Sequence, residues 1–338
     1  MNDRDVSLPS ARDLDLAVGG QAVIEGVMMR SPTAVATAVR VPDGRIVVQK
    51  RPFRSFLVRW KLHKVPVLRG GLHLLESLGI GIGALMYSAE QASVEERVES
   101  VARRPLDTVM MWGTLLVAFA VSMGVFFYFP LLVADWLGVE HRIWFNVTEG
   151  VIRIALFIGY LLLIERLPDM ARVFQYHGAE HMSIHAFENG RPLTPAGARP
   201  FPTLHPRCGT SFLFFVMLIA LVVFSFLGRP ETVAQRLQRL LWIPVIGGLA
   251  YEAIKLSGRY PRAWWIRPLI WPGLMLQKIT TSVPDDDQLA VGLAALKAVL
   301  TPAEPGSPVR TWYEPEEPAA EPAPAAAAGA TATPEATS

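Results

Sequence analysis

The sequence predicts a mainly α-helical integral membrane protein, with about four transmembrane helices and a small N-terminal β-strand element on the cytoplasmic side. Hydrophobic residues make up 51% of the 338 residues, and the mean hydropathy is +0.31. An ordinary soluble protein of this length is less apolar. Several long segments also carry no charge, and strand-like alternation precedes the first of them.

Residues 17–104 are predicted to form a cytoplasmic strand element followed by an interfacial helix. Residues 33–40 alternate apolar and small side chains, Pro42-Asp43-Gly44 is a turn signal, and residues 45–50 continue as a strand, which together predict a hairpin. Residues 19–29 (GGQAVIEGVMM) are predicted to form another strand. Residues 1–16 are polar and acidic, resemble no signal peptide, and are predicted to be disordered.

The membrane domain is predicted to cover residues 105–300. Four segments are long and apolar enough to cross hydrocarbon, namely 108–134, 143–164, 208–228 and the shorter 240–256. The second contains Glu149 and Arg153, which are four residues apart and can pair with each other. The fourth contains Glu252, which can either pair with Lys255 or take part in a site.

Three other segments are assigned by composition. Residues 70–92 are apolar enough to be a fifth span, although several Gly interrupt them. An interfacial helix is favoured because a full span would place every later loop on the side opposite to the one that its charges indicate. Residues 263–277, with three Trp and two Pro, are predicted to be interfacial or re-entrant, and residues 285–300 a short acid-capped helix. The Pro- and Ala-rich acidic tail, 301–338, is predicted to be disordered.

The distribution of Lys and Arg predicts the orientation in a bacterial inner membrane. Between Arg30 and Arg69 the chain is strongly basic, with Asp43 as the only acid, and the loop 166–210 after the second span is basic too. Both termini and the loop 166–210 are therefore predicted to be cytoplasmic, although the Arg residues of the loop 229–239 oppose this weakly. Cations alternate with aromatics in residues 45–69, which favours anionic lipid headgroups as partners rather than nucleic acid.

The loop 166–210 carries a candidate metal site. His177, Glu180 and His181 lie at helical spacing, as does His185, so they are expected to share one face. HxxEH is the spacing of an inverted zinc-hydrolase motif, in which two imidazoles bind one metal and the Glu acts as a base. His205-Pro-Arg-Cys208-Gly resembles half a zinc knuckle. We predict zinc ligands among His177, His181, His205 and Cys208, with Glu180 as the catalytic residue.

Each signal also has a non-metal interpretation. The HxxEH stretch could be an amphipathic surface helix whose imidazoles face water. His205 and Cys208 could belong to a capped turn with a small buried thiol, or could form a nucleophilic Cys–His pair. The single reduced Cys fits a cytoplasmic location.

Several contiguous motifs together resemble the YqhQ-like family of bacterial membrane proteins, which is also catalogued as a domain of unknown function. The resemblance covers residues 17–300 and is carried by GGQAVIEGVMMR, YHGAEH, HPRCGTSF, Tyr251-Glu252 and Gln277-x-x-Thr280-Thr281. It implies a multi-pass membrane protein of a family often labelled a predicted metal-dependent enzyme. His185 is not part of the family motif.

Two functions remain open from the sequence. In a metal-dependent hydrolase, His177 and His181 would bind zinc, a third ligand would come from His205, Cys208 or Glu252, and one position would stay open for water. In a non-catalytic scaffold or assembly protein, the four predicted ligands would close a structural zinc site. The count of protein ligands discriminates between the two functions, and the position of Glu180 favours the enzyme.

Overall fold

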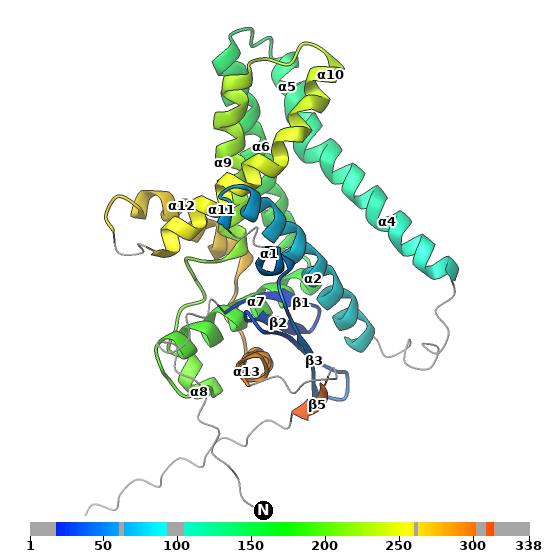
Figure 1. Cartoon of the computed structure of the whole chain (residues 1–338), viewed down its shortest axis with the longest axis vertical. Helices are drawn as coiled ribbons and strands as arrows, with labels where there is room; N and C mark the ends of the chain where they lie inside the picture. Colours follow the sequence, from blue (N-terminus) through cyan, green and yellow to red (C-terminus); the bar gives the residue numbers. More distant parts are fainter. Residues whose placement is uncertain (1–17, 61–63, 93–104, 260–262, 302–308, 314–338) are drawn as a thin grey trace, which may run out of the picture.

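The computed structural model describes residues 18–60, 64–92, 105–259, 263–301 and 309–313. Two parts are stacked along the long axis, a bundle of long helices at one end and a layered sheet-and-helix part at the other (Figure 1). The expectation of a mainly helical chain with a small N-terminal strand element is confirmed. The predicted disordered residues 1–16 lie outside the described residues.

The N-terminal strands form an antiparallel meander. Its strands are β1 (Gly19–Val23), β2 (Gly26–Arg30), β3 (Ala34–Arg40) and β4 (Ile46–Pro52), in the order of the chain. The predicted β3–β4 hairpin is confirmed, and Gly44 supplies the positive φ of 86° in its turn. The single strand expected at 19–29 is wrong, because Glu25 adopts a φ of 50° and reverses the chain into two paired strands.

One short piece of the C-terminal tail is ordered against this sheet. Strand β5 (Val309–Tyr313) pairs antiparallel with β4, with Ile46 opposite Tyr313. Tail residues 302–308 and 314–338 lie outside the described residues. The tail was expected to contribute no element at all, so β5 is a feature that composition did not predict.

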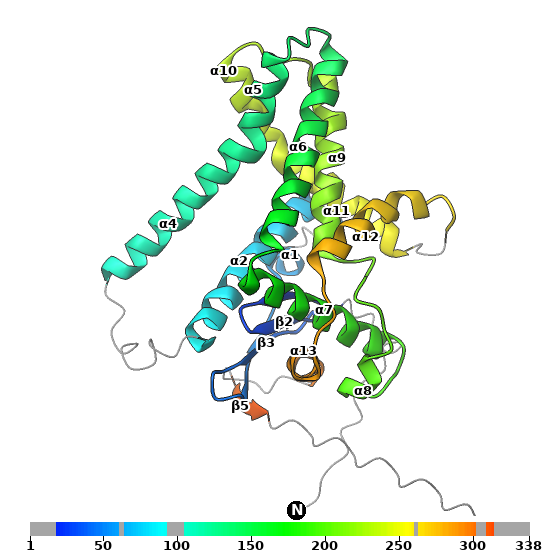
Figure 2. The same cartoon turned by 180° about the vertical axis from the view of Figure 1, so that it is seen from behind.

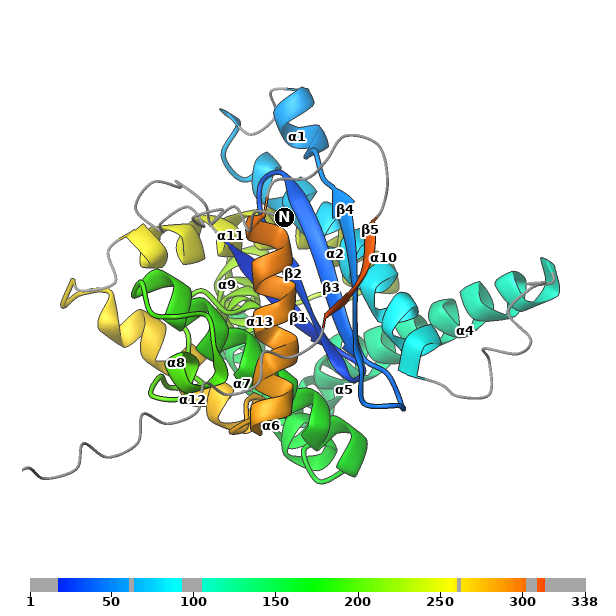
Figure 3. The same ribbon diagram turned by 90° about the horizontal axis from the view of Figure 1, so that it is seen from below.

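Helices cover both faces of the sheet. Helices α7 (Pro168–Glu188) and α13 (Asp286–Leu300) cover one face, where Met29 and Ala36 meet Tyr176 and Leu296 in the largest apolar core (Figure 3). The predicted acid-capped helix is α13, which Asp285 caps together with Gln288. Helix α2 (Leu68–Ala92) covers the other face, with Ala84 against Val23 and Met28.

Five helices are long and apolar enough to cross a membrane, and they indicate a membrane protein. They are Leu68–Ala92, Trp112–Trp136, Arg142–Ile164, Gly209–Leu227 and Val233–Ser257. The last four coincide with the predicted spans. The second is a continuous rod made of α4 (Pro105–Met123), the π-helix η2 (Gly124–Tyr128) and α5 (Phe129–Trp136).

The bundle is formed by α6 (Arg142–Ile164), α9 (Gly209–Leu227) and α11 (Ile243–Arg259), while α4 diverges from it (Figures 1 and 2). The predicted pair of Glu149 and Arg153 is present in α6. The short helices are α1 (Phe56–Arg59), α8 (Pro195–Ala198), α10 (Val233–Gln238) and the 3₁₀ helix η3 (Arg239–Trp242).

Helix α2 links the bundle to the sheet. Its first turn crosses α11 closely, because a Cβ on Gly70 would lie 2.8 Å from the Cα of Gly248. Its second half lies on the sheet. Helix α12 (Arg267–Thr280), in the segment predicted to be interfacial, lies across the base of the bundle, and Trp264, Trp265 and Trp271 of this segment are exposed.

Candidate metal centre

Helix α7 presents two neighbouring stripes of side chains. His177, His181 and His185 follow one another at four-residue spacing and contact the chain between Thr203 and Cys208. Tyr176 and Ile184 of the adjacent stripe pack into the core beneath the sheet, and Glu180 lies between them in sequence. The prediction that the imidazoles share a face is confirmed.

Three of the predicted site residues converge. Nε2 of His177 lies 3.2 Å from Sγ of Cys208, and the His177 and His181 ring centroids are 4.5 Å apart. The three ligand atoms of His177, His181 and Cys208 all lie within 4.8 Å of one another, so this group could hold a metal ion. Cys208 reaches the group because it is the N-cap residue of α9. Within the described ranges, no fourth His, Cys, Asp or Glu joins this group.

Backbone carbonyls fix the protonation pattern of both imidazoles. Nδ1 of His177 donates to the Thr280 carbonyl at 2.8 Å, and Nδ1 of His181 donates to the Thr203 carbonyl. A carbonyl can only accept, so each Nδ1 carries a hydrogen, and in a neutral imidazole Nε2 is then the nitrogen with the lone pair. Burial also lowers the pKa of His181, which favours the neutral imidazole that a metal requires.

Both imidazoles lie close to the same sulfur. Sγ of Cys208 lies 3.2 Å from Nε2 of His177, and all three ligand atoms of the group lie within 4.8 Å of one another. A thiol has a single proton and can donate to only one of two imidazole nitrogens. A cation between the three atoms would satisfy both nitrogens and a thiolate at once, which is the ordinary preference of zinc for nitrogen and sulfur.

A glycine of α7 allows one of the orienting carbonyls to come close. A Cβ on Gly178 would lie 2.0 Å from the Ser282 carbonyl oxygen. The backbone N–H of Ser282 also donates to the Phe174 carbonyl at 2.9 Å. The segment 280–282 is therefore pressed against α7, and this contact holds the Thr280 carbonyl on His177.

Gln277 is a site residue that no sequence motif had assigned a role. Its side chain is buried in α12, where Oε1 accepts from the His205 backbone N–H at 2.8 Å. Nε2 donates to the His205 carbonyl at 2.8 Å and to Oγ of Ser211 at 2.9 Å. These bonds fix the turn that carries Cys208. The one sequence feature that could have pointed to Gln277 is the Gln277-x-x-Thr280-Thr281 stretch, which is among the motifs that resemble the family.

His205 lies beside the group of three ligand atoms and belongs to a second group with His185 and Glu188. Its ring centroid is 5.6 Å from that of His181. Nδ1 of His205 accepts from the Arg207 backbone N–H at 3.3 Å, so Nε2 carries the hydrogen and donates to Glu188 at 3.4 Å. Arg207 also forms an ion pair with Glu188. The metal-ligand role of His205 stays a prediction.

Glu180 is buried at 5% exposure. Burial raises the pKa of its carboxyl group, opposed by nearby His177 and His205 and by a hydrogen bond with the Gly20 backbone. The carboxylate lies outside the group of three ligand atoms. A carboxyl with a raised pKa is suited to proton transfer near neutral pH, and its catalytic role stays a prediction.

Glu252 does not supply the third ligand that the sequence allowed. It binds Arg69 of α2 through two hydrogen bonds, Nε to Oε1 at 2.6 Å and Nη2 to Oε2 at 2.5 Å. The pairing with Lys255 considered from the sequence is replaced by this bidentate contact between α2 and α11. Arg69 bonds to both carboxylate oxygens of Glu252, so this carboxylate stabilises the packing of α2 against α11.

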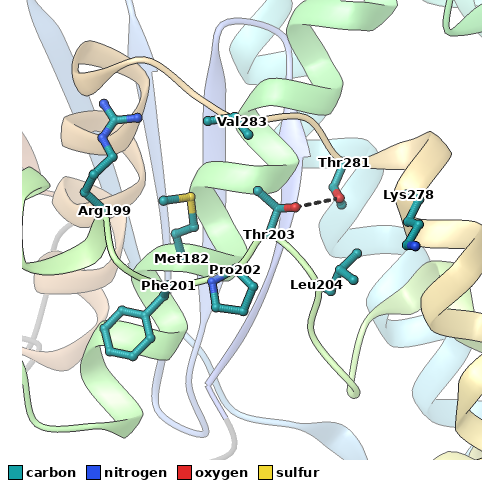
Figure 4. A pocket seen from close by; sticks show the side chains of 9 residues that line it. All are labelled: Met182, Arg199, Phe201, Pro202, Thr203, Leu204, Lys278, Thr281 and Val283. Carbon is teal, nitrogen blue, oxygen red and sulfur yellow. Dashed lines mark hydrogen bonds between the residues drawn. The ribbon is translucent and has the colours of Figure 1, made fainter.

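A pocket of about 450 Å³ is lined in part by the segment that carries the Thr203 carbonyl (Figure 4). Oγ1 of Thr281 donates to Oγ1 of Thr203 at 3.2 Å across one wall. The lining residues are Met182, Arg199, Phe201, Pro202, Thr203, Leu204, Lys278, Thr281 and Val283. None of the three converging ligands lines it.

Comparison with known proteins supports the resemblance given by the motifs. The chain is 30% identical over 297 residues to the uncharacterized protein YqhQ of Bacillus subtilis (strain 168), covering 84% of this chain and 92% of that protein. No solved structure matches. The family model described as "Protein of unknown function (DUF1385)" matches residues 65–302. The chain therefore belongs to the DUF1385 family of YqhQ-like proteins, a family defined by sequence and not by an assigned reaction.

Proposed function

We propose that this protein is a membrane metalloenzyme of hydrolase type, which binds one zinc ion through His177, His181 and Cys208. The observation that carries the proposal is the convergence of two imidazoles and one sulfur, whose ligand atoms lie within 4.8 Å of one another while each Nδ1 is bonded to a backbone carbonyl. Zinc is proposed because nitrogen and sulfur ligands suit it, and because a reduced thiol is stable in the cytoplasm.

The number of protein ligands supports a catalytic zinc site over a purely structural one. Three protein ligands leave a tetrahedral ion one position for water, and a zinc ion lowers the pKa of such a water toward neutrality. The chain's own contribution is orientation: the Thr280 and Thr203 carbonyls hold the imidazoles, and Gln277 holds the turn of Cys208. Glu180 is the proposed proton acceptor because burial raises the pKa of its carboxyl group.

A closed structural zinc site is the second candidate, and burial favours it. His181 is 1% exposed and Cys208 is 6% exposed, and a catalytic ion needs access for a substrate. His205 is the residue that would close the site, since its ring lies 5.6 Å from that of His181. In this alternative the zinc would tie the start of α9 to α7 and stabilise the fold.

The proposed setting is a bacterial inner membrane with both termini and the segment 166–210 in the cytoplasm. The five apolar helices support the membrane itself. We propose that α2 lies along the cytoplasmic surface, because its second half packs on the sheet and cannot be surrounded by lipid. Anionic lipid headgroups are the proposed partners of the basic segment 45–69.

Metal analysis and zinc X-ray absorption on detergent-purified protein test the proposal. The open site requires one zinc per chain, with two nitrogen ligands, one sulfur ligand and one further oxygen. His181→Ala and Cys208→Ala should lose the zinc, whereas His205→Ala should keep it. The exposed His141 provides the matched control His141→Ala. Loss of zinc from His205→Ala would support the closed site, and a wild type without zinc would contradict both.

Glu180→Gln separates catalysis from zinc binding. Glutamine keeps the shape of the side chain but cannot accept a proton as a base. The enzyme proposal expects a folded variant that retains zinc and fails to complement a deletion strain. Full complementation by this variant would leave only the structural zinc site.

A further inference from the structure

Helices α5 and α10 lie at the end of the bundle farthest from the sheet (Figures 1 and 2). The first half of α6, the residues after α9 and the α10–η3 segment carry a group of arginines there. We call its members the arginine cluster: Arg142, Arg153, Arg229, Arg236 and Arg239. Nothing in the metal-centre proposal uses these residues.

The inner part of the arginine cluster is buried among apolar helices. Arg153 forms an ion pair with Glu149 and donates through Nε to the Phe126 carbonyl at 3.1 Å. Arg239, at 2% exposure, donates through Nη2 to Asn146 at 2.7 Å and to the Gly228 carbonyl at 2.5 Å. Arg153 is thus paired with a carboxylate, whereas the hydrogen bonds of Arg239 go to two neutral acceptors.

The outer part leads from this buried pair toward the surface. Asp135 accepts from Arg229 at 3.1 Å and also from Arg236, so one carboxylate serves two arginines. The guanidinium of the exposed Arg142 lies against Gly228, where an added Cβ would be 3.0 Å from Nε. Arginines therefore follow one another from the surface to the buried interior around the end of α9.

The arginine cluster is short of negative charge and of hydrogen-bond partners. The contacts found among the described residues pair Arg153 with Glu149, and both Arg229 and Arg236 with Asp135, so two carboxylates serve a group of five arginines. Buried Nη1 of Arg239, Nε of Arg236 and Oε2 of Glu149 have no hydrogen-bond partner in the structure. Buried donors without acceptors are costly in an apolar environment, and ionisable groups inside a bundle usually mark a functional site.

The π-helix is a second, independent sign of a functional site. A π-helical turn within an apolar helix is rare and occurs frequently at such sites. In η2, the carbonyl of Phe126 accepts from Arg153, and the hydroxyl of Tyr128 accepts from Nη1 of Arg236 at 3.4 Å. The irregular turn thus supplies acceptors to two members of the arginine cluster.

We propose that the arginine cluster binds a phosphate group that enters beside Arg142 and is held by Arg239 and Arg236. A phosphate fits better than a carboxylate, because its additional oxygens can engage several guanidinium groups at once. It would also supply the negative charge that Glu149 and Asp135 leave unbalanced. Two sources share this chemistry, the headgroup of a phospholipid at that end of the bundle and free inorganic phosphate.

Thermal unfolding of the full-length, delipidated protein in detergent tests the site with three probes: inorganic phosphate, a short-chain phosphatidylglycerol, and a short-chain diacylglycerol that lacks the phosphate. A ligand of the folded state raises the midpoint as its concentration passes the dissociation constant. We expect a rise with phosphatidylglycerol, or with both phosphate-bearing probes, and none with diacylglycerol. A response to phosphatidylglycerol alone identifies the lipid headgroup, and a response to both identifies a site open to free phosphate.

Variants decide whether the arginine cluster is responsible. Arg239→Gln and Arg236→Gln should each weaken phosphate-dependent stabilisation by about tenfold or more, the loss expected for a charge-assisted contact. Arg142→Gln, at an exposed position, tests the same site if the buried variants do not fold. Arg267→Gln on α12 is the matched control and should respond as wild type. Equal responses in all these proteins, equal stabilisation by diacylglycerol, or no response to any probe would overturn the proposal, and none of these readings depends on zinc.

Discussion

Replacing Gly178 with alanine should damage the metal centre without touching a ligand. The new Cβ would lie 2.0 Å from the Ser282 carbonyl oxygen, whereas ordinary contacts begin at 3.4 Å. The segment 280–282 would have to retreat from α7 by about 1.4 Å. The hydrogen bond from His177 to the Thr280 carbonyl, now 2.8 Å, would then be lost. Overpacking of this kind costs roughly 1–3 kcal/mol.

The loss of an orienting carbonyl should also weaken zinc binding, by about 10- to 100-fold for a partner of a ligating histidine. Chelator competition measures the zinc affinity, and thermal unfolding with and without zinc measures the stability. Gly159→Ala in α6 is the matched control, because a Cβ added to Gly159 meets nothing within 4 Å. Wild-type zinc affinity in Gly178→Ala would refute the reasoning that the 280–282 segment orients His177.

Three further predictions concern topology, the tail and acid stability. In a cysteine-free background, external labelling should modify a cysteine placed at Gly138 and spare one at Gly190; the opposite pattern would invert the topology. A chain ending at Tyr313 should keep the wild-type thermal midpoint, whereas a chain ending at Leu300 should have a lower midpoint because β4 loses β5, one of its two partner strands. Equal midpoints would show that β5 adds no stability. The Arg172 guanidinium holds the pKa of Glu25 below its ordinary 4.5, so this pair stabilises the fold above that pH and the contribution disappears as the pH falls through the lowered pKa. Glu25→Gln should therefore melt below wild type at pH 7, and the gap should close as the pH falls through the lowered pKa.

The spans and the hairpin could be predicted because their signals are local. An uncharged run such as 208–228 must avoid water along its whole length, whatever its neighbours are. The β3–β4 hairpin follows from alternation on both sides of Pro42-Asp43-Gly44. Helical spacing likewise placed His177 and His181 on one face of α7.

The predictions failed where the local structure depends on a single residue or on a partner that is distant in sequence. Glu25 turns the chain between β1 and β2 through a positive φ. Glutamate rarely adopts a positive φ, and the neighbouring residues do not indicate a turn there. Strand β5 follows a long gap in sequence and forms only because β4 offers an unpaired edge. Glu252 bonds with Arg69, which is 183 positions away, so the proximity of Lys255 in sequence was misleading.

By itself, the sequence determined the apolar helices, the N-terminal hairpin and which side chains of the loop 166–210 could bind a metal, because composition and short-range spacing express them directly. Only the tertiary structure decided which candidates meet. It brought Cys208 to His177 and His181 while leaving His205 in a neighbouring group. It also recruited Gln277 and Thr280, which lie 72 and 103 positions from the residues they hold. The physical reason is that hydrogen bonds and close packing between distant segments depend on the folded path of the chain, which no local pattern encodes.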